Sequence, residues 1–579
     1  MTYSDIQELC KYREFKEIYT EEKLIEENLH MKRYQILPVR YMTNENEIAK
    51  RFLIYHSPGT GKSFTALWIL LNFIDIYKKP SIILVKSKEA IMEFKQRVAL
   101  WYAYTYNYRQ PPTGITNYHQ FIKRYIEFHT YITFCKSVET IKDISLYENR
   151  LLIIDEIHHF RNTVGNKIIY NKLLKFLNNI KDSRVLFMSA TPIFDNYNEI
   201  TSLVKLIKPD FDFSIKITPE KLEEIMKGHV SYYGLNPPDT SVNFIGSHVP
   251  RIERFKIFKV SMKGLQLENY KTLASESKSI CNIGISHVKA TLGVIGFKEE
   301  DSHDNYDENN NNNNNSDDRY ILKNENIINS NSIIQNIIRK QSKKLENYCC
   351  KLHECLKIIN SENSPDGPVF IYCNIIDEVG IYYFAALLCE MGYKYIYDKK
   401  SALKFGQKLS LNENINYPEL KEMRINRNKK KWNFTFVTGD KRLCPNVMER
   451  LGIFNDTSNR NGTTIKVLLG SDILSESVDI MNIRQLHILT PHWNYEKINQ
   501  IIGRICRVGS HDALPPHQRN VNIYLYMAYN SDHECEYENS INYSIDYVKY
   551  IISEKKYNQA LMYNNALQNA SIESLICDN

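Results

Sequence analysis

The residues with the clearest capacity for chemistry lie in a loop that follows the apolar run Phe52–Tyr55. The loop reads His56-Ser57-Pro58-Gly59-Thr60-Gly61-Lys62-Ser63, and a helical pattern of apolar residues continues from it to Tyr77. Such a loop between a strand and a helix presents backbone N–H groups to phosphate oxygens. Lys62 would reach the β- and γ-phosphates, and the Ser63 hydroxyl would bind Mg²⁺. The segment predicts a nucleoside triphosphate site built on Gly59, Thr60 and Gly61, although His56 replaces the first glycine of the common form.

Two adjacent carboxylates follow another apolar run. Asp155 and Glu156 come directly after Leu151–Ile154, a run that is typical of a buried parallel strand. Ligands bind at the carboxyl ends of such strands. Asp155 would hold Mg²⁺ directly or through water, and Glu156 would orient and deprotonate the attacking water. His158 either links the nucleotide state to the other domain or packs in the interior.

Arginines three residues apart follow the run Leu486–Leu489. They belong to the series Gln500, Arg504 and Arg507. On a predicted helix, both arginines can point to one side. In an ATPase with two domains they would stabilise charge on the transferring γ-phosphate, whereas surface salt bridges are the alternative. Small hydroxyls, Ser189 and Thr191, also follow a strand-like run, but their chemical signal alone is weak.

Short β-branched and aromatic runs alternate with longer helical patterns and must position these groups. They are typical of buried strands in parallel sheets. The runs are Phe52–Tyr55, Ile82–Val85, Leu151–Ile154 and Val185–Met188, and then, after a gap, Val369–Tyr372, Phe434–Val437, Ile465–Leu469, Leu486–Leu489 and Ile523–Met527. The sequence therefore predicts an α/β protein with two separate domains.

Length and composition narrow the class of protein. The 579 residues are 43% hydrophobic and 24% charged, which excludes fibrous and wholly disordered chains. The formal net charge of +7 permits a nucleic-acid partner without indicating one. The 12 scattered cysteines are typical of reduced thiols, and no apolar run reaches the ~18 residues of a membrane helix. We therefore expect a soluble intracellular protein with no membrane partner.

Three segments have alternative interpretations. Asp301–Asp318 is acidic and rich in Asn, which predicts a disordered surface loop or an acidic interaction loop. The segment Cys349–Cys355 contains three cysteines and a histidine that could bind a metal, but the apolar spacing around it favours a helix that buries one face. The basic run Lys421–Lys431 is either a solvated surface or a cluster that contacts phosphates.

The order and spacing of the phosphate loop, Asp-Glu-x-His, Ser-Ala-Thr and Gln-x-x-Gly-Arg-x-x-Arg motifs resemble those of superfamily 2 helicases and translocases. Flanking pieces similar to the Snf2-like branch are Arg33-Tyr34-Gln35, Gln266–Tyr270, Ser342–Leu345 and Trp493-Asn494. Lys227–Tyr232, Pro237-Pro238 and Ser544-Ile545-Asp546 resemble the poxvirus-type group, which includes nucleoside triphosphatase I and the early transcription factor small subunit. Similar proteins occur in other large cytoplasmic DNA viruses and in yeast linear cytoplasmic plasmids.

The resemblance covers nearly the whole chain and implies two RecA-like P-loop domains in tandem, with an insertion between them and a helical C-terminal tail. The implied parts are an N-terminal helical segment at 1–30, domain 1 at 31–200, the insertion at 201–345 with its acidic, Asn-rich loop at 299–318, domain 2 at 346–530 and the tail at 531–579.

The resemblance also implies an ATP hydrolase that uses ATP and Mg²⁺ and moves on nucleic acid. Gln35 would contact adenine, and Ser477 stands where the family often has glycine. Four residues would couple hydrolysis to movement: His158, Ser189, Thr191 and Asp479. DNA is the favoured polymer, in cytoplasmic viral or plasmid transcription or replication, with an RNA polymerase or other transcription machinery as a partner. The alternatives are an RNA helicase and a transcription-factor subunit that uses ATP as a switch.

Overall fold

A computed structural model describes most of the chain, and it divides into two compact units. One unit comprises Met1–Asn236 and Lys556–Asn579, and the other comprises Pro237–Lys555. The described residues are 32–43, 50–106, 114–140, 143–160, 167–193, 197–234, 240–279, 320–323, 326–377, 379–404, 432–472, 479–507, 509–533 and 542–577.

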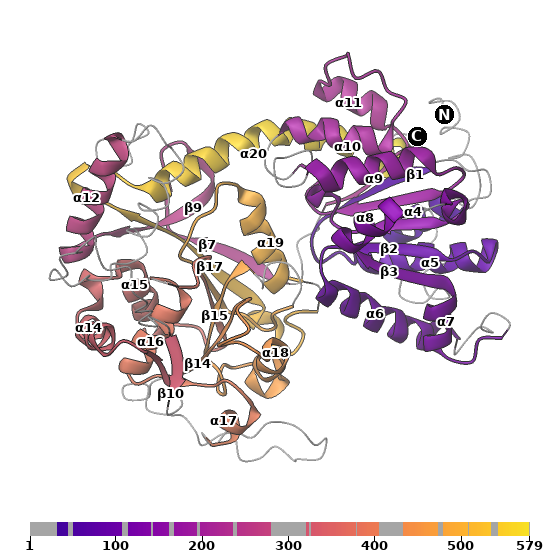
Figure 1. Ribbon diagram of the computed structural model, residues 1–579. Helices are drawn as coiled ribbons and strands as arrows, with labels where there is room; N and C mark the ends of the chain where they lie inside the picture. The colour runs from indigo at the N-terminus through magenta and orange to yellow at the C-terminus, as the bar shows by residue number, and fades with distance from the viewer. Residues whose placement is uncertain are drawn as a thin grey trace, which may run out of the picture. The chain divides into compact units, whose positions relative to one another are not determined.

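The first unit is built on a six-stranded parallel sheet (Figure 1). Its strand order is β3-β2-β4-β5-β1-β6, and every neighbouring pair is parallel. The strands are β1 (Arg51–His56), β2 (Ser81–Val85), β3 (Ile126–Thr130), β4 (Leu151–Ile154), β5 (Arg184–Ser189) and β6 (Val230–Tyr233). The four strands predicted in this part of the sequence are confirmed, whereas the edge strands β3 and β6 were not predicted.

Alternate residues of these strands enter two separate hydrophobic layers, because successive side chains of a strand point to opposite faces. Ile54 and Ile153 belong to the layer under one set of helices, and Leu53 and Ile154 belong to the layer under the other set. The first set is α4 (Arg33–Thr43), α5 (Lys62–Tyr77), α6 (Lys88–Tyr106) and α7 (Tyr118–Tyr125). The second set is α8 (Tyr131–Thr140), α9 (Lys167–Asn179), α10 (Ile200–Ile207), α11 (Pro219–Met226) and the C-terminal part of α20 (Ile545–Asn569).

The second unit contains a larger sheet, of nine strands. Its order is β13-β14-β15-β12-β16-β17-β9-β8, and β7 also pairs with β17. The strands are β7 (Ser241–Ile245), β8 (Ser247–Val249), β9 (Ile252–Ser261), β12 (Val369–Tyr372), β13 (Lys394–Tyr395), β14 (Asn433–Val437), β15 (Val467–Gly470), β16 (Gln485–Ile488) and β17 (Asn520–Tyr529). All five strands predicted for this part are confirmed. A separate antiparallel hairpin joins β10 (Tyr320–Lys323) to β11 (Asn326–Asn329).

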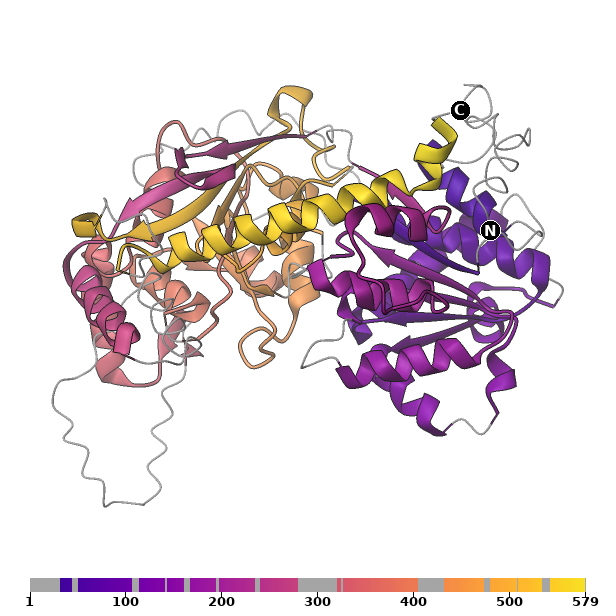
Figure 2. The ribbon, with the colours of Figure 1, turned by 90° about the horizontal axis from the view of Figure 1, so that it is seen from above.

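Helices of the second unit supply much of its core. They are α12 (Gly264–Ser279), α14 (Ser332–Ser342), α15 (Cys350–Ile359), α16 (Ile381–Glu390), α17 (Lys399–Lys404), α18 (Val447–Asn455) and α19 (Tyr495–Ile505). The long helix α20, traced in Figure 2, and the short α21 (Ile572–Cys577) form the helical C-terminal tail. The chain is thus an α/β protein with two RecA-like sheets in tandem, the first parallel and the second parallel except where β8 pairs with β9.

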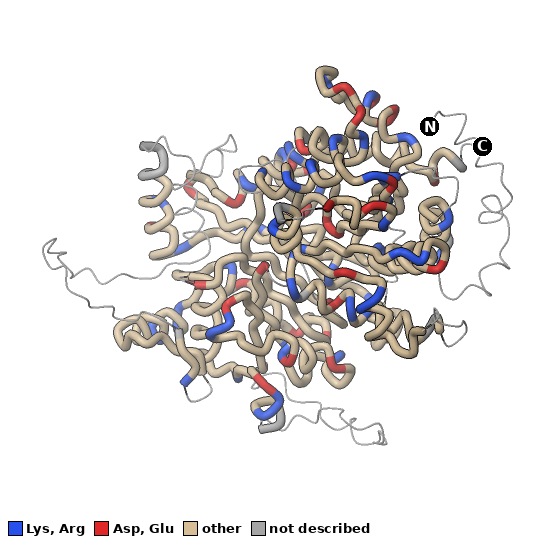
Figure 3. The backbone as a smooth tube through the Cα atoms, turned by 45° about the vertical axis from the view of Figure 1, so that its right-hand side comes forward, with Lys and Arg blue, Asp and Glu red and all other residues tan. Residues whose placement is uncertain are grey.

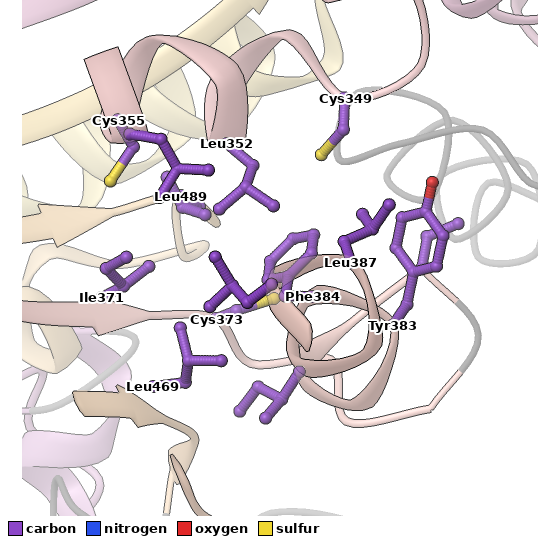
Figure 4. Close-up of a cluster of buried hydrophobic side chains, with 14 of the residues drawn as sticks. Cys349, Leu352, Cys355, Ile371, Cys373, Tyr383, Phe384, Leu387, Leu469 and Leu489 are labelled. Atoms are coloured by element: carbon purple, nitrogen blue, oxygen red, sulfur yellow. The ribbon is translucent and has the colours of Figure 1, made fainter. Parts of the chain in front are cut away.

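The cysteine-rich segment packs as part of this core. The predicted helix is confirmed as α15, which buries Cys350, Leu352 and Cys355. Figure 4 shows Cys349, Cys355 and Cys373 among apolar side chains of the same cluster. Burial raises the pKa of the Cys349 thiol well above its ordinary value, and within the described ranges no group of three or more His, Cys, Asp or Glu side chains is arranged to hold a metal ion.

Other expectations fall partly or wholly outside the described residues. These are the N-terminal segment 1–30, the acidic loop, the basic run Lys421–Lys431 and Ser477. Along the part of the backbone that is described, Lys and Arg are interspersed with Asp and Glu (Figure 3), and none of its helices has the length and apolar character needed to cross a bilayer. The domain boundaries given above stay predictions. Two strands of the segment 201–345 pair with different sheets: β6 pairs with β1 of the first unit, and β9 pairs with β17 of the second unit.

Candidate nucleotide-binding site

The glycine loop connects β1 to α5. Gly59 and Gly61 have φ angles of 81° and 85°, a left-handed conformation that glycine adopts without steric cost. The Lys62 ammonium donates to the backbone carbonyl oxygens of His56 and Ser57, at 3.0 and 3.4 Å. Helix α5 begins at this lysine without a side-chain cap, so its first turn carries the N–H groups that bind anions. These features fit a phosphate group in the loop.

Helix α4 contacts the same loop. The Gln35 side-chain amide donates to the carbonyl oxygens of Thr60 and Gly61, at 3.3 and 3.5 Å. The Tyr34 hydroxyl also donates to the Thr60 carbonyl, at 2.7 Å, and its ring stacks on Tyr233 with centroids 3.6 Å apart. Gln35 is therefore placed to support the loop, and its contact with adenine stays a prediction.

The Gly61→Ala variant should bind ATP about tenfold more weakly or worse. A non-glycine residue at this φ costs about 1–2 kcal/mol, and the added Cβ would lie 2.7 Å from the Gln35 amide nitrogen. The test is the KM for ATP together with the thermal unfolding temperature. Gly452→Ala in α18 is the control, because its Cβ would meet no atom within 4 Å. An unchanged KM for Gly61→Ala would contradict the role of this glycine.

The predicted acid pair lies at the carboxyl end of β4. The Asp155 carboxylate accepts a hydrogen bond from the Glu156 backbone N–H at 3.0 Å, and the Tyr131 hydroxyl donates to the Asp155 carbonyl oxygen. Removal from water and the neighbouring Glu156 charge raise the pKa of Asp155, while the Lys62 charge acts in the opposite direction. A carboxylate held near this lysine and away from water is suited to Mg²⁺, which prefers oxygen ligands.

His158 connects the acid pair to the end of β5. Its side chain is 2% exposed, and its Nδ1 lies 3.3 Å from a carboxylate oxygen of Glu156 and 3.1 Å from the Ser189 hydroxyl. That hydroxyl also accepts from the Thr191 backbone N–H at 3.0 Å. The structure thus brings together two motifs that are far apart in the sequence, Asp-Glu-x-His and Ser-Ala-Thr, and His158 contacts both.

The arginines of the second unit meet at Asp479. Arg507 pairs with its carboxylate, and Arg504 Nη1 lies 3.9 Å from the same oxygen. The expectation of two arginines on one helix is corrected. Helix α19 ends at Ile505, so Arg504 lies in the helix and Arg507 lies beyond its end, before Gly509 with its φ of 84°. Both side chains nevertheless reach one carboxylate, and Gln500 lies within α19.

The sequence analysis missed two contacts near the loop, which join His56 to Ser231 and Ser231 to Glu573. Ser231 lies in the segment Lys227–Tyr232, which contributes to the family resemblance, but nothing in that segment indicates which residues Ser231 contacts. Glu573 is 342 positions away from Ser231 in the chain, and no local pattern marks it.

The fold and these motifs define an ATPase with two tandem helicase-type domains. Residues 28–194 match the family model described as "Type III restriction enzyme, res subunit", and residues 400–509 match the "Helicase conserved C-terminal domain".

Proteins of large DNA viruses and of a yeast plasmid are similar to most of the chain. A protein of Acanthamoeba polyphaga mimivirus that bears the name of an ATP-dependent RNA helicase is 26% identical over 83% of this chain and 80% of its own length. The termination factor NPH-I homolog of African swine fever virus (isolate Warthog/Namibia/Wart80/1980) is 25% identical over 84% of this chain and 71% of its own length. A killer-plasmid helicase of Kluyveromyces lactis is 25% identical over 66% of this chain and 46% of that protein.

These matches confirm the resemblance to the superfamily 2 helicases, and the similar proteins come from the same viral and plasmid group. The chain is an ATP-hydrolysing enzyme of the helicase or translocase type. Its site uses a nucleotide, and it binds nucleic acid.

Proposed function

We propose that the chain hydrolyses ATP·Mg²⁺ in the first unit and uses the reaction to move on DNA. In this proposal the loop residues Gly59–Ser63 hold the phosphates, Asp155 and Ser63 hold Mg²⁺, and Glu156 accepts a proton from the attacking water. The bound cation supplies positive charge against the phosphate oxygens. Gln35 contacts adenine, and Gln500, Arg504 and Arg507 stabilise charge that develops on the γ-phosphate.

The observation that carries this proposal is the contact series from Glu156 through His158 to Ser189 and Thr191. It joins the group that would activate water to the end of the neighbouring strand. A change at Glu156 during hydrolysis would therefore reach β5 directly. Coupling of this kind, together with Asp479 in the second unit, is what converts hydrolysis into movement in a motor.

The cellular setting is part of the proposal. The name of the African swine fever virus relative, a termination factor, favours work in transcription beside an RNA polymerase. The viral and plasmid relatives favour the cytoplasm or the virion. The name of the mimivirus relative favours RNA as the alternative polymer, and a factor that uses ATP as a switch is the second alternative.

Steady-state ATP hydrolysis without polymer and with single-stranded DNA, duplex DNA or RNA tests the proposal. Stimulation by DNA and not by RNA is the expected result. Stimulation by RNA alone would overturn the choice of DNA. A rate that no polymer changes would overturn the autonomous motor and favour a subunit that needs its transcription partner.

The Lys62→Ala variant should lose nearly all turnover, by about 10²-fold or more, because the loop would lack its phosphate-binding ammonium. The same ATP hydrolysis assay measures this loss. Lys79→Ala is the matched control, since Lys79 is exposed in the turn after α5, and it should retain the wild-type rate. Equal turnover in the Lys62→Ala variant and the wild type would place the nucleotide elsewhere.

A further inference from the structure

The C-terminal segment covers the outer edge of the first sheet. Strand β6 pairs with β1 on one side. On the other side, Val230 forms a parallel bridge with Ser571, and the Gly228 N–H donates to the Ala570 carbonyl at 3.3 Å. The tail of the chain therefore occupies the edge of the sheet that carries the phosphate loop, where an uncovered strand would expose unpaired N–H and C=O groups.

Glu573 holds this edge through two hydrogen bonds. One carboxylate oxygen accepts from the Ser231 hydroxyl at 2.5 Å, and the other accepts from the Tyr232 backbone N–H at 2.9 Å. The Ser231 oxygen in turn lies 2.7 Å from His56 Nε2. The three side chains form a continuous series that runs from helix α21 through β6 to the first residue of the phosphate loop.

The direction of the hydrogen bonds follows from the carboxylate. Burial raises the pKa of the Glu573 carboxyl to about 7, although the hydrogen bonds from Ser231 and Tyr232 act in the opposite direction. When Glu573 is ionised it can only accept, so the Ser231 hydroxyl donates to it and the Ser231 oxygen accepts from His56 Nε2–H. The His56 side chain is fully buried, and burial with the nearby Lys62 charge lowers its pKa to about 3. The ring is therefore neutral, and opposite an ionised Glu573 its one proton lies on Nε2. The other ring nitrogen, Nδ1, has no hydrogen-bond partner among the described residues.

The backbone of His56 links this series to the loop. Its carbonyl oxygen accepts from the Lys62 ammonium at 3.0 Å, and the next N–H, that of Ser57, donates to the Tyr233 carbonyl at 3.0 Å. A rotation or shift of His56 would move the carbonyl that Lys62 contacts.

We propose that Glu573 is a positioning residue for the phosphate loop, acting through Ser231 on His56. The C-terminal helix thereby becomes part of the ATP-binding unit. The inference rests on the proposed function, because it takes the loop to be the ATP site. It adds a group that touches neither ATP nor Mg²⁺ and that sets how well the loop is arranged before ATP arrives.

Two substitutions in the full-length chain test the inference. Ser231→Ala removes one hydroxyl from the middle of the series, and Glu573→Ala removes its end. Each should raise the KM for ATP, and the dissociation constant of a fluorescent ATP analogue, by about tenfold, the size of one hydrogen bond to a charged group. The kcat should stay within about twofold of wild type, because a change in arrangement before binding is a change in uniform binding.

Three further variants make the result specific. Ser574→Ala is the matched control, because the Ser574 hydroxyl donates to the Asn569 carbonyl at 2.7 Å and belongs to the same C-terminal segment. The double variant Ser231→Ala with Glu573→Ala should be no worse than either single variant, since both break one series. Lys62→Ala must weaken binding of the same analogue if the loop is the ATP site at all.

The outcomes distinguish the positioning role of Glu573 from the position of the ATP site. Unchanged KM values in both single variants, or additive effects in the double variant, overturn the role of Glu573 while the loss in Lys62→Ala leaves the ATP site standing. Unaltered binding by Lys62→Ala overturns the proposed function itself. If Glu573→Ala unfolds at the assay temperature, Ser231→Ala and the control decide the question alone.

Discussion

The Glu156→Gln variant should hold ATP with nearly the wild-type affinity and hydrolyse it about 10²–10⁴-fold more slowly, the range that general base catalysis supplies. Gln has the same shape as Glu but cannot accept the proton of the attacking water. Its amide can still meet His158 Nδ1, which lies 3.3 Å from the Glu156 carboxylate. The local structure should therefore survive while the chemical step fails. Single-turnover hydrolysis and equilibrium binding of a fluorescent ATP analogue measure the two effects separately.

A matched substitution shows whether the loss is specific. Glu148 lies in the turn before β4, where its backbone N–H donates to the Ser145 carbonyl, and Glu148→Gln should keep the wild-type rate. A wild-type rate in Glu156→Gln would remove this carboxylate from the role of base. Weak ATP binding in the same variant would instead make it a ligand of the nucleotide or its metal.

The strands that position the candidate site could be predicted from the sequence because their central residues are buried on both faces of the sheet. Strand β4 and the central residues of β1 and β5 are continuous apolar runs, as expected for the centre of a parallel sheet covered by helices on both sides. The edge strand β3 has the sequence Ile-Glu-Phe-His-Thr and is only partly buried. Its mixed pattern has no such signature. Strand β6, Val-Ser-Tyr-Tyr, is interrupted by a serine and is fully buried only at its first two positions.

Several residues that carried the family resemblance turn out to be structural contacts of the second unit. The Gln266 side chain is fully buried, and it accepts from the Cys350 backbone N–H at 2.9 Å, at the start of α15. The Tyr270 hydroxyl accepts from the Ile545 N–H at 2.8 Å, at the start of α20. A motif marks such residues without saying what they do, since hydrogen bonds between distant segments depend on the folded chain.

In the candidate site too, contacts between segments that are distant in the sequence could not be predicted. Residue types and spacing predicted the loop, the acid pair and the arginines, because each motif is local. The contact of His158 with both Glu156 and Ser189 needed the register of β4 against β5, which pairs Ile154 with Phe187. The series from Glu573 to His56 needed the position of the C-terminal helix, which no local pattern specifies.

The Asp546→Ala variant should destabilise the second unit by about 3–5 kcal/mol, the effect of breaking a buried ion pair from one side. Asp546 and Lys351 have side chains that are 0% and 1% exposed, and their charged atoms lie 2.5 Å apart. The same carboxylate accepts from the Ala528 N–H at 2.9 Å. Lys549 is also buried. The Asp546 charge raises the pKa of Lys549, but burial has the larger effect and lowers this pKa to about 8.

Thermal unfolding followed at pH 7 and at pH 9 measures this loss and separates its sources. A lysine whose pKa is lowered in the folded state releases a proton on folding between that pKa and its ordinary value, so the folded state gains stability as the pH rises through this window. At pH 9 Lys549 is mostly neutral, and the part of the penalty that comes from its unpaired charge should vanish. Asp532→Ala is the control, because the Asp532–Lys271 pair is exposed and an exposed ion pair contributes little to stability. Equal unfolding temperatures for Asp546→Ala and this control would show that the buried charges are compensated by other groups.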